Sequence, residues 1–214
     1  MTPLRLVDGP AKTDDAVAQL RPGRHGLPAD LVASHQRQRI FEATTAALAE
    51  QGYGRITAGR VIELAGVSSS TFYEHFEDLW SCLPAAYAAE ADHLRKEVEA
   101  ACAAEGDPRG PARAGIAAAL DFLASEPAVA RLLSAEPPPQ VTELVAQRLD
   151  LTERLGAMLR AARQQDGDST TPPALERRLI GAALALVSTY VVGGESECLP
   201  ELEPALSEFL LAPL

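Results

Sequence analysis

Helical periodicity runs through nearly the whole chain after residue 28, and no stretch alternates in the way that a strand requires. Apolar residues recur three and four positions apart, and proline or glycine separates one segment from the next. The pattern predicts an all-α fold, with helices at residues 29–51, 57–65, 68–76, 78–104, 111–124, 127–134, 139–165, 173–194 and 199–211. Pro84 is expected either to kink the fourth helix or to move its start to about residue 83.

A change of pattern near residue 80 divides the chain into three parts. Residues 1–28 contain several prolines and glycines and no sustained period, so we expect a flexible N-terminal arm. Residues 29–80 carry three short or medium helices, and residues 81–214 carry six more. The chain has 214 residues, 47% of them apolar, which is enough to bury a core.

The turn Ala65-Gly66-Val67-Ser68 joins two short helices and predicts a helix-turn-helix. Gly66 supplies the left-handed backbone conformation that such a turn needs. Four apolar side chains are expected to hold the two helices at a steep angle: Val61, Leu64, Val67 and Phe72. The second helix is then free to enter a major groove. Its exposed residues are expected to be Ser69, Ser70, Thr71, Tyr73 and Glu74, whose hydroxyl groups can donate to phosphates and base edges.

The segment Gln36–Leu83 resembles the DNA-binding domain of the tetracycline-repressor (TetR) family of bacterial transcription regulators. The residues that carry the resemblance are Ile40, Ala43, Gly52-Tyr53, Thr57, Val61, Ala65-Gly66-Val67-Ser68, Thr71-Phe72-Tyr73 and His75-Phe76. The resemblance implies a three-helix DNA-binding domain followed by a six-helix domain that binds a ligand and dimerises. It also implies a homodimer on an inverted-repeat operator in double-stranded DNA, released by a small-molecule effector.

The resemblance also implies which side chains contact DNA. Thr57, Tyr73 and His75 match phosphate-contacting positions, and Ser69, Ser70 and Thr71 match groove-facing positions. Ser68 opens the same helix and is included in the expected DNA-binding set. One departure is Leu79, which stands where the family commonly has a lysine. A second is that residues 68–75 contain no lysine or arginine.

The overall charge adds weight to both departures, because the chain carries a formal net charge of −11 and has fewer basic than acidic residues. A uniformly basic nucleic-acid surface is therefore excluded, although a local DNA-binding patch is not. Phosphate contacts supply most of the affinity for DNA, so we expect arginines to compensate: Arg21, Arg24, Arg37 and Arg39. Arg24 is expected to reach the adjacent minor groove. The alternative hypothesis is a helix-turn-helix protein with lost or weak DNA binding that acts through protein–protein contacts.

The sequence gives no sign of catalysis, and we expect no enzyme activity, cofactor or metal. It contains no Walker loop, dinucleotide-binding glycine motif, HExxH or GxSxG motif. His93 and Cys102 are spaced so that they would not share a helix face, which disfavours a metal site. The three cysteines form no CxxC pair, which favours a reducing cytoplasm. The apolar run Leu179–Gly194 is short for a membrane span and is interpreted as a buried helix.

The C-terminal part is expected to hold both the effector pocket and the dimer interface. Pocket walls are predicted at Phe122, Leu123, Leu155, Met158 and Leu159, and the low aromatic content of 5% favours an apolar effector. The last two helices are candidates for a four-helix bundle with their copies. The predicted interface residues are Ile180, Leu184, Val187, Val191, Leu202, Leu206 and Phe209. The alternative is that this apolar run is the core of the monomer. Trp80 is expected to pack between the two parts rather than to serve as a ligand platform.

Overall fold

The computed structural model describes residues 28–104, 110–139, 141–165 and 172–211. Within these ranges the chain forms nine α-helices and one 3-10 helix, and no residue is in a strand. The α-helices are α1 (Ala29–Gln51), α2 (Ala58–Ala65), α3 (Ser69–His75), α4 (Leu79–Ala103), α5 (Pro111–Ser125), α6 (Pro127–Ser134), α7 (Thr142–Gln165), α8 (Pro173–Gly193) and α9 (Glu203–Leu211). The 3-10 helix η1 (Ser196–Leu202) precedes α9. The expected all-α fold class is confirmed.

Local chemistry explains where the helices begin. The side chains of Thr57 and Ser68 cap α2 and α3, each by accepting a hydrogen bond from a backbone N–H three residues on. Asp78 and Ser81 form a reciprocal capping box that starts α4. Proline at the first position starts α5, α6 and α8, where its missing N–H removes no helical bond.

Two expected helix bounds were wrong, and one alternative for a third is excluded. Helix α4 begins at Leu79 rather than at residue 83, because the capping box of Asp78 and Ser81 stabilises a first turn ahead of Pro84. The seventh helix begins at Thr142 rather than at residue 139, because Val141 donates its N–H back to the Pro138 carbonyl in a turn. The last segment starts as η1 and becomes α-helical only at Glu203, since Pro200 cannot donate to an α-helical ladder.

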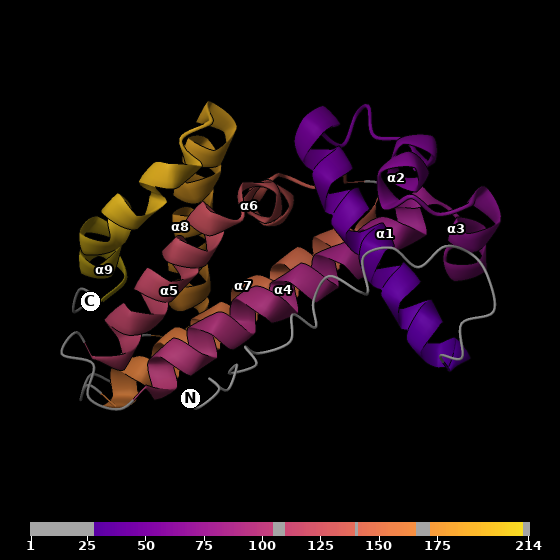
Figure 1. The fold of residues 1–214 in the computed structure, drawn as a ribbon. Helices are drawn as coiled ribbons and strands as arrows, with labels where there is room; N and C mark the ends of the chain where they lie inside the picture. Colours follow the sequence, from indigo (N-terminus) through magenta and orange to yellow (C-terminus); the bar gives the residue numbers. More distant parts are fainter. Residues whose placement is uncertain (1–27, 105–109, 140, 166–171, 212–214) are drawn as a thin grey trace, which may run out of the picture.

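The long helices α4 and α7 lie side by side and connect the two ends of the molecule (Figure 1). Helices α1, α2 and α3 form an N-terminal unit at one end, and α5, α8 and α9 lie at the other. Helix α6 packs between α1 and α8. We call residues 28–78 the N-terminal unit and residues 79–211 the body.

The buried apolar residues form two clusters rather than one. The larger cluster runs without a break from α1, α2 and α3 through α4 into the middle of the body. The smaller cluster lies in the outer part of the body and contains Ala112, Leu159, Ala162, Ile180, Leu184 and Leu210. Because α4 contributes to the core of the N-terminal unit and also extends far into the body, a displacement of α4 affects both.

Candidate DNA interface and effector cavity

The turn between α2 and α3 has the conformation that its sequence predicts. Gly66 ends α2 with φ 59° and ψ 34°, in the left-handed region that glycine adopts without strain. Its carbonyl accepts a hydrogen bond from Arg39 Nη2 (3.2 Å), which ties the turn to α1. The guanidinium lies so close that a Cβ at residue 66 would meet Arg39 Nη2 at 2.7 Å. Both the backbone conformation and this contact favour glycine here.

Aromatic packing fixes α3 on the N-terminal unit. Phe72 is fully buried and lies against Tyr73 edge to face, with ring centroids 5.3 Å apart, and against Phe76 at 5.9 Å. Phe76 in turn contacts Phe41 of α1 at 5.9 Å. The expected wedge is confirmed for Val61 and Phe72. Leu64, by contrast, is 38% exposed, because it lies on the side of α2 that faces solvent.

The outer side of α3 faces solvent and does not pack on the body. Ser69, Ser70, Tyr73 and Glu74 are exposed, Tyr73 to 56%. Their spacing places them as two i,i+4 pairs on one helix face, opposite Phe72. A face of this kind is available to a duplex groove.

The hydroxyl groups of the expected DNA-binding set divide into two kinds. Ser68 Oγ accepts from the Thr71 backbone N–H (3.0 Å), and the two side-chain hydroxyls are 2.9 Å apart. Thr71 is half-buried rather than exposed as expected. Ser68 and Thr71 therefore start the helix, whereas Ser69 and Ser70 point outward with no part in the cap.

The remaining expected contacts lie at helix ends outside this face. Thr57 is exposed at the start of α2, where its hydroxyl accepts from the Arg60 N–H (3.2 Å). His75 ends α3, and its Nε2 lies 3.4 Å from Gln36 Oε1 of α1. Arg24 lies outside the residues that the structure describes.

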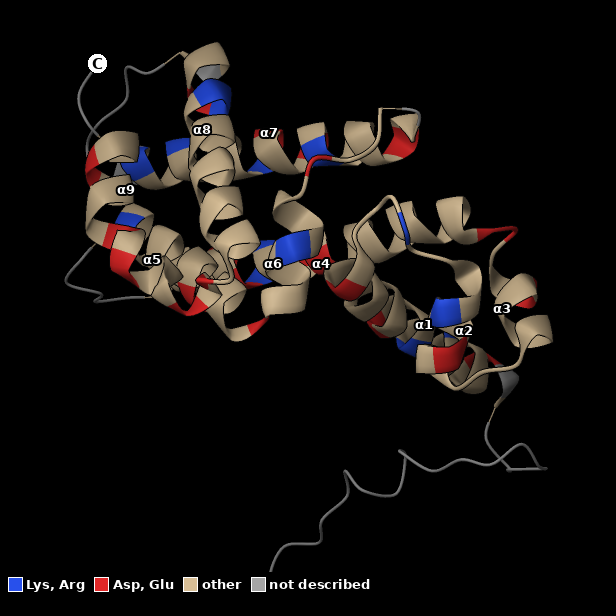
Figure 2. Cartoon of the chain, turned by 90° about the horizontal axis from the view of Figure 1, so that it is seen from above, with Lys and Arg blue, Asp and Glu red and all other residues tan. Residues whose placement is uncertain are grey.

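Basic side chains near α3 are few, and their surroundings differ. Arg37 is exposed and lies over the rings of Phe41 and Phe76, at 5.2 and 5.1 Å from the centroids, which orders its guanidinium. Arg60 is occupied by ion pairs with Glu50 (2.9 Å) and Glu63 (3.1 Å). The ribbon of α3 in Figure 2 carries the colour of acidic residues at one place and the colour of lysine and arginine nowhere.

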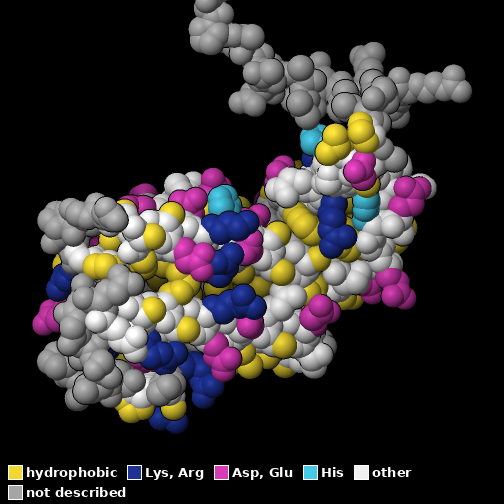
Figure 3. Space-filling view, turned by 90° about the horizontal axis from the view of Figure 1, so that it is seen from below, with side chains coloured by type: hydrophobic (Ala, Val, Ile, Leu, Met, Phe, Trp, Pro, Cys, Tyr) yellow, Lys and Arg dark blue, Asp and Glu magenta, His cyan; other side chains and the backbone are white. Residues whose placement is uncertain are grey.

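The body does not compensate with a separate basic surface on the face drawn in Figure 3, where its basic side chains lie among acidic ones. Arg95 pairs with Asp92 (2.7 Å) and Glu99, and Arg154 pairs with Asp150 (2.6 Å). These ion pairs place a carboxylate beside each of the two guanidinium groups, so neither arginine forms an isolated basic site.

The prediction for Trp80 was wrong. Its side chain is 43% exposed at the start of α4 and does not join the core between the two parts. The neighbouring Leu79 and Leu83 are buried in its place. The helix face is the reason, since Leu79, Leu83 and Tyr87 follow one another at helical spacing toward the core while Trp80 points away from them.

Polar ties join the body to the N-terminal unit. Arg131 of α6 donates from Nη1 to the Ala49 carbonyl near the end of α1 (2.9 Å). Close by, burial raises the pKa of Tyr53 to about 12, and it raises the pKa of Tyr87 as well. Both phenols therefore stay neutral at physiological pH, and neither buried hydroxyl has a hydrogen-bond partner in the described part of the chain.

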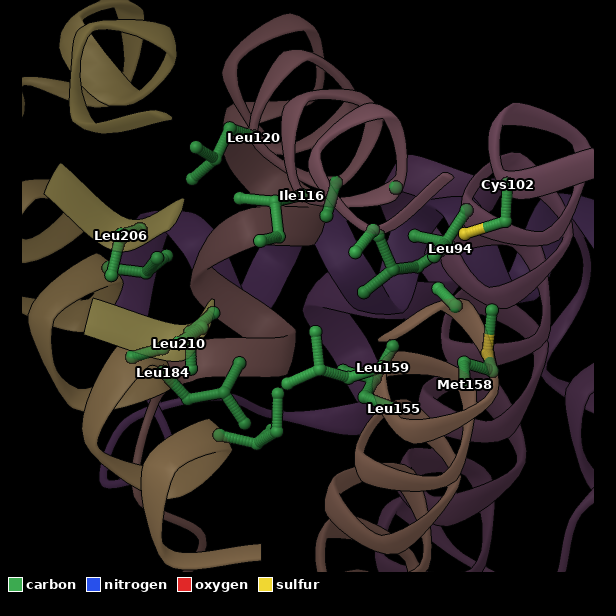
Figure 4. Close-up of a pocket in the computed structure, with 18 of the residues that line it drawn as sticks. Leu94, Cys102, Ile116, Leu120, Leu155, Met158, Leu159, Leu184, Leu206 and Leu210 are labelled. Atoms are coloured by element: carbon green, nitrogen blue, oxygen red, sulfur yellow. The ribbon is translucent and has the colours of Figure 1, made fainter. Parts of the chain in front are cut away.

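An apolar cavity of about 100 Å³ separates the two core clusters. Its walls come from α4, α5, α7, α8 and α9, and its lining is almost purely aliphatic (Figure 4). The wall includes Leu94, Val98, Cys102, Ala119, Leu123, Leu155, Met158, Leu159, Ile180 and Leu184. An unfilled, enclosed apolar cavity of this size would cost on the order of 2 kcal/mol of stability, and the aliphatic lining suits an apolar molecule.

Four of the five predicted pocket residues line this cavity: Leu123, Leu155, Met158 and Leu159. Phe122 does not, because its ring lies edge to face on His93 at 4.9 Å. The pocket was expected among residues 80–104, 111–124 and 139–194, a range that includes α4 and α8, but no wall residue was named on α4, α8 or α9, and the contribution of α9 was not predicted. Their apolar periodicity was visible in the sequence, but which apolar face meets the cavity depends on tertiary packing.

The predicted dimer residues lie mostly inside the subunit. Ile180, Leu184, Val187, Val191 and Leu206 are buried in the body, because one face of α8 and of α9 packs on α5, α6 and α7. Leu202 is half-buried, and Phe209 is 45% exposed. The expectation that α8 is buried all round was wrong, since Leu186 and Val192 are 38% and 64% exposed. An exposed small and apolar face remains on α8: Ala182, Ala185, Leu186, Thr189 and Val192.

Residues 40–78 match the family model described as bacterial regulatory proteins, tetR family. The match covers α2, α3 and most of α1, the elements that build the exposed helix face. The N-terminal unit is a TetR-family DNA-binding domain. No curated protein is significantly similar to the chain in sequence.

Solved structures extend the likeness to the whole TetR-like fold. The fatty acid degradation regulator FadR from Bacillus halodurans has a TM-score of 0.71 at 16% identity, with 83% of this chain and 98% of that chain covered. FadR from Bacillus subtilis, solved with stearoyl-CoA, has a TM-score of 0.70 at 17% identity, with 83% and 98% covered. A TetR-like regulator from Rhodococcus sp. RHA1 has a TM-score of 0.61 at 19% identity, with 87% and 100% covered. The chain therefore has the fold of TetR-family transcription regulators, which are not enzymes.

No described helix has the length and hydropathy that crossing a membrane would require. No group of three or more His, Cys, Asp or Glu residues in that part of the chain is placed to hold a metal ion.

Proposed function

We propose that the protein is a dimeric transcriptional repressor that an apolar, chain-bearing effector releases from an inverted-repeat operator. The observation that carries the proposal is the free outer face of α3, where Ser69, Ser70 and Tyr73 are exposed on a TetR-family domain. We place the division between the DNA-binding domain and the effector domain near residue 80. Thr57, which caps the start of α2, and His75, the last residue of α3, are proposed phosphate contacts.

The effector is proposed to carry a hydrocarbon chain. The cavity offers aliphatic walls and no charged side chain, so a polar molecule would lose its hydrogen bonds on entry. The cavity is also small, below the roughly 150 Å³ of an engineered cavity that binds benzene. A long chain must therefore widen it. The neighbour FadR from Bacillus subtilis holds stearoyl-CoA, which supports an acyl chain as the first class to test.

The mechanism follows from α4, which contributes Leu94, Val98 and Cys102 to the cavity wall and Leu79 and Leu83 to the core around α1–α3. Widening the cavity is proposed to shift α4 and, with it, the position of α3. Two recognition helices about 34–36 Å apart fit successive major grooves. An effector that binds more tightly to a dimer with a different spacing of the two helices shifts the population away from the DNA-competent state.

The dimer is proposed to form through the exposed face of α8 together with Phe209 of α9. Small residues at Ala182 and Ala185 allow close approach, and Leu186 and Val192 supply apolar area. An isologous contact brings the same face of the second subunit onto it. The proposed interface therefore keeps α8 and α9, as the sequence predicted, but uses their exposed residues in place of the predicted residues that are buried in the subunit.

Binding of DNA from the region next to the protein's own gene tests the proposal. Fluorescence anisotropy at low and moderate salt should give saturable, competitor-resistant binding, and acyl-CoA or free fatty acid should weaken it. One observation favours the second candidate function, protein–protein contact: Glu74, Glu77 and Asp78 are all exposed around the end of α3. Equally weak binding to every duplex would favour that candidate and refute the repressor.

The dimer surface is tested separately by Leu186→Glu and Val192→Glu. Both are expected to turn a dimer into a monomer in sedimentation experiments and to weaken operator binding at least tenfold. Leu149→Glu is the matched control, since Leu149 is 57% exposed on α7, away from α8. A dimer that survives both α8 substitutions would refute this surface.

A further inference from the structure

Glu74 is a carboxylate on the helix face that is proposed to enter the groove. It follows Tyr73, and it lies one turn after Ser70 on the exposed face of α3. The side chain therefore meets DNA whenever Ser70 does. Two more acidic residues, Glu77 and Asp78, follow in the sequence, but both lie beyond the end of α3.

The Glu74 side chain is oriented by its own helix. Ser70 Oγ donates to Glu74 Oε1 at 3.1 Å. In the part of the chain that the structure describes, Ser70 is the one hydrogen-bond partner of this carboxylate, and no lysine or arginine forms an ion pair with it. One carboxylate oxygen is held by the serine, and Oε2 is left to accept from a ligand.

A carboxylate in a major groove meets phosphates that repel it and base edges that are mostly acceptors. The exceptions are the amino groups of cytosine N4 and adenine N6, which donate. Adenine carries the N7 acceptor beside its amino group, which repels a second carboxylate oxygen, whereas cytosine carries none there. A Glu on a recognition helix therefore gains most at cytosine.

We propose that Glu74 is a specificity-determining residue that reads a cytosine in each half of the operator by accepting from its N4 amino group. The proposal rests on the function proposed above and deepens it by naming one base. Ser70 acts as a positioning residue, because its hydroxyl fixes the carboxylate. The absence of lysine and arginine from α3 fits this role, since a basic neighbour would neutralise the acceptor.

The test is selection of bound duplexes from a random library by the full-length protein and by three variants. Glu74→Gln presents an amide in place of the carboxylate and favours adenine, to which Asn and Gln bind in bidentate fashion. Glu74→Ala removes the carboxylate that is proposed to accept from the base. Glu77→Gln is the matched control, because it removes one exposed negative charge just beyond α3. All four proteins are compared by circular dichroism before selection.

The expected result is an inverted repeat with one C·G pair at the same place in each half-site. On duplexes that differ at that pair alone, the wild-type and Glu77→Gln proteins should prefer cytosine by about 5- to 100-fold. Glu74→Gln should prefer adenine there, and Glu74→Ala should show no preference. Both Glu77→Gln and Glu74→Gln should bind all duplexes somewhat more tightly, because each removes one negative charge.

Two outcomes would overturn the inference, and they differ in what they say of the proposed function. An inverted repeat that is selected equally by the wild type and both Glu74 variants would refute the role of Glu74 and leave the repressor intact. Failure of the wild type to select any repeat would refute the proposed function and this inference with it.

Discussion

The N-terminal unit and the body both bury apolar side chains between helices, yet they differ in the kind of side chain and in how it packs. Around Phe72 the aromatic rings of α1 and α3 touch one another and leave the side chain fully buried. In the body, aliphatic side chains from five helices surround a cavity that divides the core. Close packing suits the N-terminal unit, whose α3 is proposed to fit a DNA groove. Looser packing suits the body, which is proposed to bind an effector.

Large-to-small substitutions give the strongest test of this contrast. Phe72→Ala is expected to cost about 3–5 kcal/mol, because it opens a void in a closed core. Leu159→Ala is expected to cost only about 2 kcal/mol, since one side of Leu159 already borders empty space. Urea denaturation followed by circular dichroism measures both values. Equal costs would show that the two cores are equally tight.

Filling the cavity tests the contrast from the other direction. Ala119→Leu places three carbon atoms into the space and is expected to raise the melting temperature by about 2–4 °C, the effect of roughly 1 kcal/mol in a chain of this length. The variant should also lose its response to acyl compounds in the DNA-binding assay. Ala118→Leu is the control on the same helix, because Ala118 does not line the cavity. A lower melting temperature for Ala119→Leu than for the control would contradict the position of the void.

The two kinds of serine on α3 can be separated. Ser68→Ala should lower the stability of the N-terminal unit by about 1 kcal/mol, because it removes the cap of α3. Ser69→Ala should leave stability unchanged and weaken operator binding, because its hydroxyl is exposed. Thermal melts and anisotropy titrations of both variants measure the difference. Loss of stability in Ser69→Ala would show that the serine is structural.

The sequence predicted the N-terminal unit well because its signals are local. The capping residues, the glycine turn and the spacing of Val61 and Phe72 all act within about ten residues of one another. The cavity was predicted only in part, since Leu155 and Leu159 show that α7 has an apolar face but not what faces it.

The dimer surface shows the same limit more clearly. An apolar run such as that of α8 has two candidate faces, and the sequence does not say which one the subunit itself covers. Packing of α8 on α6 and α7 decides the question by burying Leu184 and leaving Leu186 exposed. Glu74 was visible as an exposed residue, but its acidic character made it an unattractive DNA contact until its partner Ser70 was known.

The smallest expected effect concerns the junction between the two regions. Burial raises the pKa of Glu90, His93 opposes this, and Glu126 and Glu42 reinforce it. A raised pKa means that the folded protein binds the proton more tightly than the unfolded chain, so stability falls as the pH rises above the ordinary carboxyl pKa of about 4.3. Glu90→Gln removes this penalty at neutral pH.

The expected gain for Glu90→Gln at pH 7 is below the roughly 2–4 °C that 1 kcal/mol produces. It should vanish at about pH 3, well below the ordinary pKa, where the wild-type carboxyl is protonated in both the folded and the unfolded state. Thermal melts at the two pH values measure it. Glu97→Gln is the control, because Glu97 lies two turns along α4 and is exposed. A gain that persists in acid would show that Glu90 acts through packing rather than through its charge.

The cavity between the two core clusters should make the lifetime of the protein in the cell depend on whether a ligand is bound. A molecule seated there completes the contacts that Ile180 and Leu184 lack on their inner side, so binding strengthens the folded state by mass action. Unfolded regulators are removed by proteases in proportion to their population. The occupied protein should therefore persist longer in the cell than the empty one, and the amount of the regulator should rise with the very compound that silences it.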